Sequence, residues 1–228
     1  MITLHYAPDN ASLILRLALE ETRMPYRAIL VDRRAGGQSS PEYLRLNPVG
    51  RIPAIETPHG AMFETAACLL WITEETGLLA PAAGTPQRPD FLKWLFFISN
   101  TLHAELRMLF YPEKYAPSAE AALSNRLHET LNGHLALLDK AVAAREGFGG
   151  LDAPIATDLY LSILLRWTAL YPRGQSGWYD LAKFPALLAL AKAVEARPAM
   201  AACQQAEGLG PTPLSAPSLP TPPEGSAL

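Results

Sequence analysis

The sequence is poor in cysteine, in net charge and in long apolar runs, and each shortage excludes a class of protein. Its two cysteines, Cys68 and Cys203, are far apart and lack CxxC spacing, so they indicate neither a disulfide framework nor a zinc site and suit a reducing compartment. The formal net charge is -3, so we expect no basic surface for nucleic acid. No apolar run reaches the roughly 18 residues of a membrane span, and no basic segment typical of a secretory signal precedes Ile2. These absences predict a soluble, cytoplasmic protein with neither membrane nor nucleic-acid partners.

Short β-rich runs alternate with helical segments in the first third of the chain. The predicted elements are strands over residues 2–6 and 26–31, a helix between them to about residue 21, a short helix at 41–44, a hairpin at 54–63 and a helix from 64 to about 76. Strand, helix and strand within about thirty residues form a βαβ unit, whose strands a right-handed crossover makes parallel. This order predicts an α/β domain over residues 1–79, with a four-stranded mixed sheet and helices on both faces.

The remainder of the chain has hardly any strand signal. Residues 80–89 have linker composition, and residues 90–207 are expected to form an all-helical domain of four or five helices. Proline is frequent in residues 208–228, which lack the side chains to order themselves independently. We expect a flexible tail, or one that lies extended on the surface.

Residues 47–65 have the most distinctive local signals. Asn47-Pro48-Val49-Gly50 is a turn sequence, and Pro53 stands directly before the apolar pair Ala54-Ile55. Because proline cannot donate to a sheet ladder, an extended peptide could pair with the backbone of Ile52 there. Glu64-Thr65 opens a helix, whose unpaired N–H groups suit a carboxylate. An ordinary hairpin followed by a capped helix is the alternative interpretation.

The order of elements resembles the glutathione transferase family over about residues 1–205. Within that family, the turn from Tyr6 to Ser12 is similar to the tyrosine-proline-alanine-cysteine-serine turn of bacterial beta-class enzymes, and Trp94 to His103 resembles their first long helix. The resemblance implies a thioredoxin-like βαβαββα domain followed by an all-helical domain, in a homodimeric detoxification enzyme. Such an enzyme uses glutathione as co-substrate and activates its thiol for attack on small, largely apolar electrophiles.

Two positions depart from the family pattern. Ala11 stands where beta-class enzymes have cysteine, so a mixed disulfide with glutathione is not available at that position. Ile155 stands where the family has a serine or threonine cap three residues before Asp158, so the capping box is incomplete.

Each group of glutathione needs a partner, and the resemblance assigns one to several residues here. The main chain of Ile52 before Pro53 would pair with the cysteinyl backbone. Thr65 would hold the γ-glutamyl carboxylate, Glu64 the γ-glutamyl amine, and Arg51 the glycyl carboxylate. Taken singly, Thr65 could equally be a helix cap and Arg51 a solvated surface charge.

Only a thiolate is a good nucleophile, so the thiol also needs donors that stabilise its charge. Ser12 is our first candidate, Tyr6 the second and Asn10 the third; a helix cap is the alternative for Asn10 and aromatic packing for Tyr6. The resemblance also places His103 near the thiol, where a pKa near neutrality would suit a donor to the sulfur or a proton carrier for the substrate. A packed interface residue is the alternative for that histidine.

Arg107 and Tyr111 follow His103 along one helix face and would line an apolar acceptor pocket, or else belong to the domain core. A metal site is not expected, because His128 and His134 are six residues apart, off the i, i+4 spacing of a helical metal pair. Two rival functions stay open. One is a glutathione-dependent isomerase or dehalogenase, and the other is a noncatalytic glutathione-fold module that binds a protein.

Overall fold

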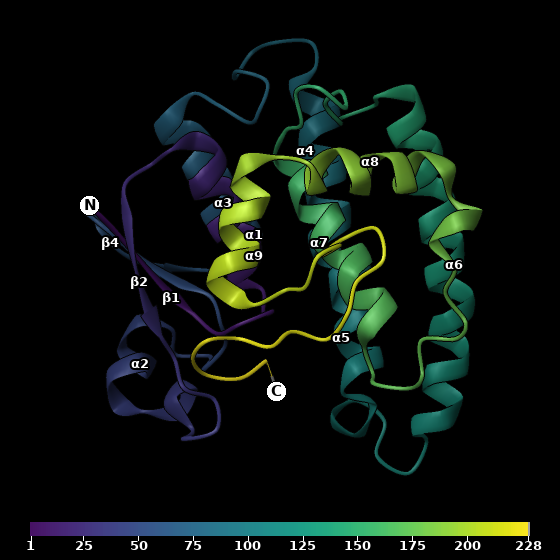
Figure 1. Cartoon of the computed structure of the whole chain (residues 1–228), viewed down its shortest axis with the longest axis horizontal. Helices are drawn as coiled ribbons and strands as arrows, with labels where there is room; N and C mark the ends of the chain where they lie inside the picture. The colour runs from purple at the N-terminus through teal and green to yellow at the C-terminus, as the bar shows by residue number, and fades with distance from the viewer. Residues whose placement is uncertain (228) are drawn as a thin grey trace. The chain divides into compact units, whose positions relative to one another are not determined.

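The computed structural model describes residues 1–227, which form two compact units (Figure 1). The sheet unit comprises Met1–Ala80, Glu195–Pro213 and the chain from Ser218 on, and the helical unit comprises Pro81–Val194 and Leu214–Pro217. The sequence analysis placed residues up to 207 in the helical domain and the remainder in a flexible tail. The structure instead groups the last helix and most of the following segment with the sheet.

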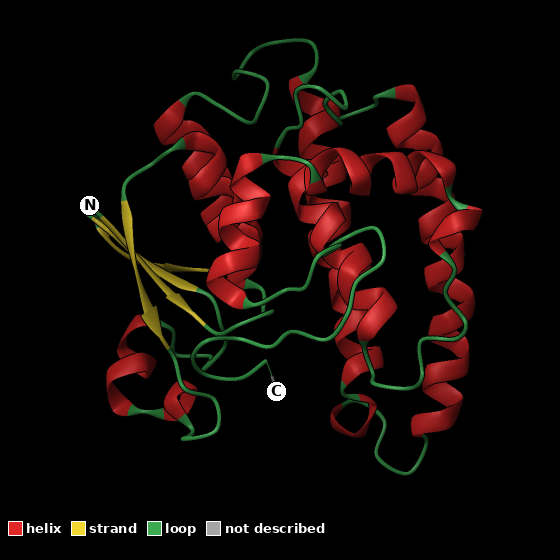
Figure 2. Cartoon of the chain, in the orientation of Figure 1, coloured by secondary structure: helices red, strands yellow, loops and turns green. Residues whose placement is uncertain are grey.

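A four-stranded mixed sheet forms the centre of the sheet unit, as predicted (Figure 2). Its strands are β1 (Ile2–Tyr6), β2 (Tyr26–Leu30), β3 (Ala54–Thr57) and β4 (Gly60–Phe63), in the order β2-β1-β3-β4. β1 runs parallel to β2 and antiparallel to β3, and β4 returns antiparallel to β3. Every residue of the inner strand β1 is buried.

Helices cover both faces of this sheet (Figure 1). They are α1 (Ser12–Thr22), α2 (Pro41–Leu46), α3 (Thr65–Thr76) and α9 (Pro198–Glu207). α1 packs against α3 and α9 on one face, while α2 contacts β3 and β4 on the other. α1 carries the apolar core of its face, because its leucines and Ile14 are fully buried.

A buried ion pair joins α9 to α1. Nε of Arg16 donates to Oε1 of Glu207 over 2.8 Å, and the other carboxylate oxygen accepts the backbone N–H of Asp9 over 2.8 Å. Glu207 is fully buried, and this burial raises the pKa of its carboxyl to about 7 despite the neighbouring guanidinium. One carboxylate of α9 therefore holds α1 and the turn at Asp9. Together with the packing of α9 against α1, this links α9 to the sheet unit.

Helices dominate the helical unit. They are α4 (Arg88–Phe97), a π-helical segment η2 (Ile98–His103), α5 (Ala104–Phe110), α6 (Glu120–Ala144), α7 (Ala156–Leu170) and α8 (Pro185–Glu195). The first long helix, which the resemblance placed at Trp94 to His103, corresponds to α4, η2 and α5 in direct succession, with a π-bulge that the sequence pattern did not reveal. Within residues 1–227, no helix is both long enough and apolar enough to cross a membrane.

Asp158 in the first turn of α7 supplies its own half of the capping box, and no side chain at Ile155 supplies the other half. Its carboxylate accepts the N–H groups of Ile155 at 2.7 Å and Gly149 at 2.8 Å, so one half of the capping box is present. Asp158 is only 1% exposed, and burial raises the pKa of its carboxyl to about 6 although these N–H groups act in the opposite direction.

Replacing Asp158 changes stability in a pH-dependent way. A carboxyl whose folded pKa is raised contributes stability that is fully present below its unfolded pKa and is lost as the pH rises through about 6. Asp158→Asn keeps an acceptor oxygen but cannot ionise. The difference in free energy of unfolding between this variant and the wild type should therefore shift in favour of the variant by up to about 3 kcal/mol as the pH rises from 4 to 8. Asp158→Ala should cost about 1–3 kcal/mol because it leaves buried N–H groups unpaired. Urea unfolding across this pH range measures both effects, and a pH-independent difference for the asparagine variant would contradict the assignment.

Candidate functional site

The sheet register brings three loop segments to one end of the sheet. His5 pairs with Ala54, and Ala54 pairs with Phe63. The next residues beyond these pairs are Tyr6, Pro53 and Glu64. They therefore lie close together at the same end of the sheet. The candidate site lies there, formed by the turn after β1, the segment before β3 and the start of α3.

The segment before β3 is fixed by side chains from α2 and its following loop. The Arg51 carbonyl accepts from the hydroxyl of Tyr43 and from Nδ2 of Asn47, each over 2.6 Å. The Ile52-Pro53 peptide bond is cis, Pro53 is buried and Ile52 is half-buried. Ile52 lies two residues before the first ladder pair of β3, and the side chain of Arg51 is exposed. The backbone at Ile52 thus has a fixed position outside the sheet ladder.

Glu64 has a strained backbone at the start of α3. Its φ is 70° and its ψ is 111°, in a region that non-glycine residues rarely adopt. Its side chain is exposed and makes no cap hydrogen bond to α3, and Thr65 next to it is 9% exposed. Strain of this kind is typical of functional sites. The sequence placed Glu64 and Thr65 at this helix start but gave no sign of the positive φ.

Ser12, the first sequence candidate for a thiol donor, has its hydroxyl engaged inside the protein. The side chain is fully buried, donates to the carbonyl of Ala7 over 3.1 Å and accepts the N–H of the same residue over 3.3 Å. This exchange closes the turn between β1 and α1. The hydroxyl therefore stabilises the turn and is not presented to solvent.

Asn10 and Tyr6 are the other two candidates in this turn. Asn10 is partly exposed and its Oδ1 accepts the N–H of Ala11 over 2.8 Å, which leaves its amide nitrogen without a partner in the described part of the chain. Tyr6 is buried, its ring lies 4.5 Å below the guanidinium of Arg16, and its hydroxyl donates to Glu224. Burial, assisted by that carboxylate, raises the pKa of the Tyr6 phenol. Of the three, Asn10 offers the most accessible donor.

His103, Arg107 and Tyr111 belong to the helical unit. Nδ1 of His103 lies 2.8 Å from the hydroxyl of Tyr160, and the ring of Trp167 is 5.5 Å from the imidazole centroid. Burial and then the charge of Arg107 lower the pKa of His103 to about 4. The expected pKa near neutrality is therefore wrong, because a packed aromatic environment disfavours the imidazolium. His103 is neutral at pH 7.

Arg107 has an aromatic environment of its own. Its guanidinium lies 5.3 Å from the ring centroid of Tyr111 and 6.0 Å from that of Tyr115, and its buried Nε has no hydrogen-bond partner among residues 1–227. The assignment of these residues to an acceptor pocket stays a prediction.

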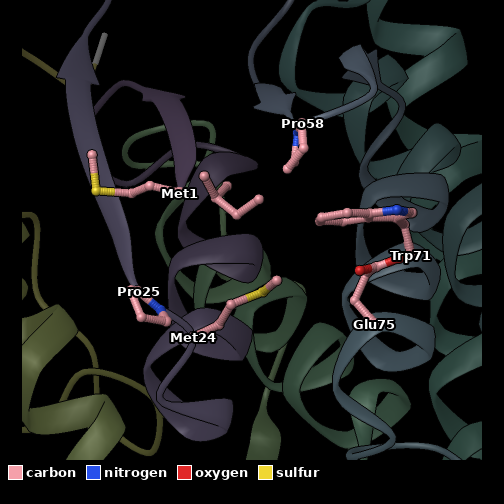
Figure 3. Close-up of a pocket in the computed structure, with 7 residues that line it drawn as sticks. Met1, Met24, Pro25, Pro58, Trp71 and Glu75 are labelled. Atoms are coloured by element: carbon pink, nitrogen blue, oxygen red, sulfur yellow. The ribbon is translucent and has the colours of Figure 1, made fainter.

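A hollow of about 360 Å³ opens at the other end of β1 (Figure 3). It is lined by Met1, Ile2, Met24, Pro25, Pro58, Trp71 and Glu75. Ile2 begins β1 and Tyr6 ends it, so this apolar hollow is separate from the candidate site.

Both cysteine thiols lie in the interior of the protein. Cys68 and Cys203 are both fully buried and unpaired, and burial raises the pKa of Cys68 to about 12 and that of Cys203 well above its ordinary value. No cluster of three or more histidine, cysteine or acidic side chains within residues 1–227 could hold a metal ion.

The burial of both thiols has a direct experimental consequence. A disulfide reagent such as Ellman's should label neither cysteine of the native protein within the time in which it labels both in denaturant, because the reactive thiolate is absent. Absorbance at 412 nm counts the labelled thiols. Rapid labelling of one native cysteine would contradict the buried assignment, and peptide mapping would identify it.

Comparison with known proteins extends the likeness over nearly the whole chain. Residues 11–75 match the N-terminal domain family of glutathione S-transferases. The chain is 31% identical over 212 residues to a glutathione S-transferase of Xanthomonas campestris pv. campestris, covering 90% of this chain and 98% of the relative. It is 31% identical over 206 residues to the disulfide-bond oxidoreductase YfcG of Escherichia coli, covering 87% of this chain and 92% of the relative. The solved structure of a sphingomonad glutathione S-transferase complexed with glutathione has a TM-score of 0.75 and 32% identity, covering 91% of this chain and 100% of that one.

Proposed function

The chain belongs to the glutathione S-transferase family, and we propose that it binds glutathione as co-substrate and adds the thiolate to small, largely apolar electrophiles. The observation that carries this proposal is the meeting of the Ile52 backbone with the start of α3 at one end of the sheet. An extended peptide with an anionic end needs both features, a strand-like partner and a group of free helix N–H donors. We propose as well that the protein is a homodimer that acts in cytoplasmic detoxification.

Each part of glutathione has a proposed partner in the sheet unit. The cysteinyl backbone pairs with the main chain of Ile52 before Pro53, and the γ-glutamyl carboxylate receives the N–H and hydroxyl of Thr65. The exposed carboxylate of Glu64 accepts from the γ-glutamyl amine, and the exposed guanidinium of Arg51 faces the glycyl carboxylate. The strained φ of Glu64 supports this assignment, since strain persists where function requires it.

The glutathione sulfur must be held as a thiolate. A free thiol has a pKa of about 8.5, and lowering this pKa by about two units requires about 2.7 kcal/mol of preferential stabilisation of the anion. A hydrogen bond to a charged group supplies about 1.5–3 kcal/mol, and the N-terminus of α1 adds part of the remainder. We propose Asn10 as the principal donor, because the hydroxyl of Ser12 is engaged with Ala7.

Replacing Thr65 tests the binding half of the proposal. Thr65→Val removes the hydroxyl without changing the side-chain shape, so the Kd for glutathione should rise about 10- to 100-fold, the equivalent of one hydrogen bond to a charged group. Titration calorimetry measures this Kd. Thr76→Val, at the far end of α3, is the matched control and should leave the Kd unchanged; equal affinity in wild type and Thr65→Val would overturn the assignment.

Replacing the two turn residues tests the thiolate half. We expect Asn10→Ala to lower kcat/KM with a nitroaromatic acceptor about 10- to 100-fold and to raise the pKa of bound glutathione, seen as a shift of the pH-rate profile. Ser12→Ala should retain turnover within a few-fold while lowering stability, because its hydroxyl closes the turn. A larger loss of kcat/KM in Ser12→Ala than in Asn10→Ala would instead indicate that Ser12 is the donor.

A second candidate reaction is the reduction of disulfides by glutathione, which the similarity to YfcG favours. In this reaction a bound glutathione thiolate attacks one sulfur of a disulfide and expels the other as a thiolate. A second glutathione thiolate then releases glutathione disulfide from the mixed disulfide. No protein thiol is needed, in agreement with the two buried cysteines. Parallel assays with a nitroaromatic acceptor and a small disulfide separate the two reactions, and glutathione binding without either turnover would indicate a noncatalytic module.

A further inference from the structure

The segment after α9, yellow in Figure 1, belongs to the sheet unit except for Leu214–Pro217, and it returns to that unit from Ser218 on. The N–H of Thr221 donates to the carbonyl of Gly208 over 2.8 Å, and a Cβ placed on Gly208 would lie 2.0 Å from the Thr221 carbonyl oxygen. Only glycine fits at position 208, both because of this close approach and because its φ is +64°. Leu209 and Leu214 are fully buried. The loop from 208 to 221 is thus anchored at both ends.

Beyond Thr221, the chain reaches the turn after β1. The carboxylate of Glu224 accepts a hydrogen bond from the hydroxyl of Tyr6, and the carbonyl of Ala227 accepts one from the guanidinium of Arg33. Between these contacts, Gly225 passes so close to the protein that a Cβ there would lie 2.6 Å from Cδ1 of Leu30. The same Cβ would be 3.3 Å from Cδ of Pro8, and the φ of Gly225 is +70°.

The surface under this segment is the carboxyl end of the parallel strands β1 and β2. Ligands of open α/β sheets bind at such ends. The segment presents a carboxylate and a main-chain carbonyl on an irregular backbone without helix or strand, which are the groups that an anionic peptide presents. Within it, Pro223, Glu224 and Gly225 are exposed, whereas Ser226 is buried.

We propose that residues 222–227 form a displaceable strap over Tyr6 and Pro8, and that an anionic peptide ligand must displace the strap to reach the Tyr6 hydroxyl. The inference deepens the proposed function, on which it rests where the ligand is glutathione. Tyr6 then gains a conditional role. Its hydroxyl is engaged by Glu224 while the strap is closed and becomes available to the ligand when the strap opens.

Gly225→Val in the full chain should open the strap, because the new side chain meets Leu30 and Pro8 and the φ is unsuitable for valine. The first readout is acetylation of the Tyr6 hydroxyl by N-acetylimidazole, quantified by peptide mapping, which should become about tenfold faster. The second readout is the Kd for glutathione, which should fall several-fold in calorimetry. Gly174→Val is the matched control, since Gly174 has a similar φ of +73° with open space around it; neither readout should change.

Glu224→Gln is a second variant that leaves the backbone path unaltered. It weakens the contact to Tyr6 and should give changes of the same sign but smaller size, with Glu113→Gln as the exposed control. An unchanged Tyr6 acetylation rate in both strap variants would overturn the strap. Faster acetylation with an unchanged glutathione Kd would overturn the proposal that the strap competes with glutathione. Faster acetylation in a protein that binds no glutathione would support the strap as a cover of Tyr6 and would refute the proposed function instead.

Discussion

The arrangement of the sheet unit depends on one carboxylate that has no access to water. Glu207 stands at the last position of α9, pairs with Arg16 in the middle of α1 and accepts the backbone N–H of Asp9. An unpaired charge in such a place would cost several kcal/mol, so both ionic partners must be present together. The consequence is a rigid connection between the last helix of the chain and the turn that carries Asn10 and Ser12. A segment nearly two hundred residues away in sequence therefore helps to define the candidate site.

In the turn after β1, packing gives Ser12 and Asn10 different roles that the sequence alone does not distinguish. Ser12 and Asn10 are both small polar residues at a helix start, and both suit a cap or a donor. The serine hydroxyl turns inward to Ala7, whereas the asparagine uses only its oxygen locally. Ser12 thus stabilises the turn, whereas Asn10 is partly exposed on it.

The strands of the sheet and their succession along the chain follow from patterns that are local in the sequence, whereas their register is seen only in the structure. Alternating β-rich runs and helical segments predicted β1 to β4 and their order, and Pro53 and Glu64 were placed at the correct ends of their elements. The positive φ of Glu64, the π-helical segment that ends at His103 and the low pKa of that histidine depend on tertiary packing, which no local pattern records. Arg16 illustrates the limit well. This charged residue of α1 is buried, and the reason is its ion pair with Glu207, which is 191 residues away in the sequence.

The proline-rich end of the chain was expected to be a flexible tail or to lie extended on the surface, and in the structure it contacts Gly208 and Tyr6. Because Thr221 is fastened to Gly208, only three peptide units separate an anchored residue from Glu224. A group on so short a tether meets its partner at an effective concentration in the millimolar range or above, however weak each contact is. Any free ligand for the surface around Tyr6 therefore competes against a local concentration set by the chain itself. That concentration is independent of the amount of protein present.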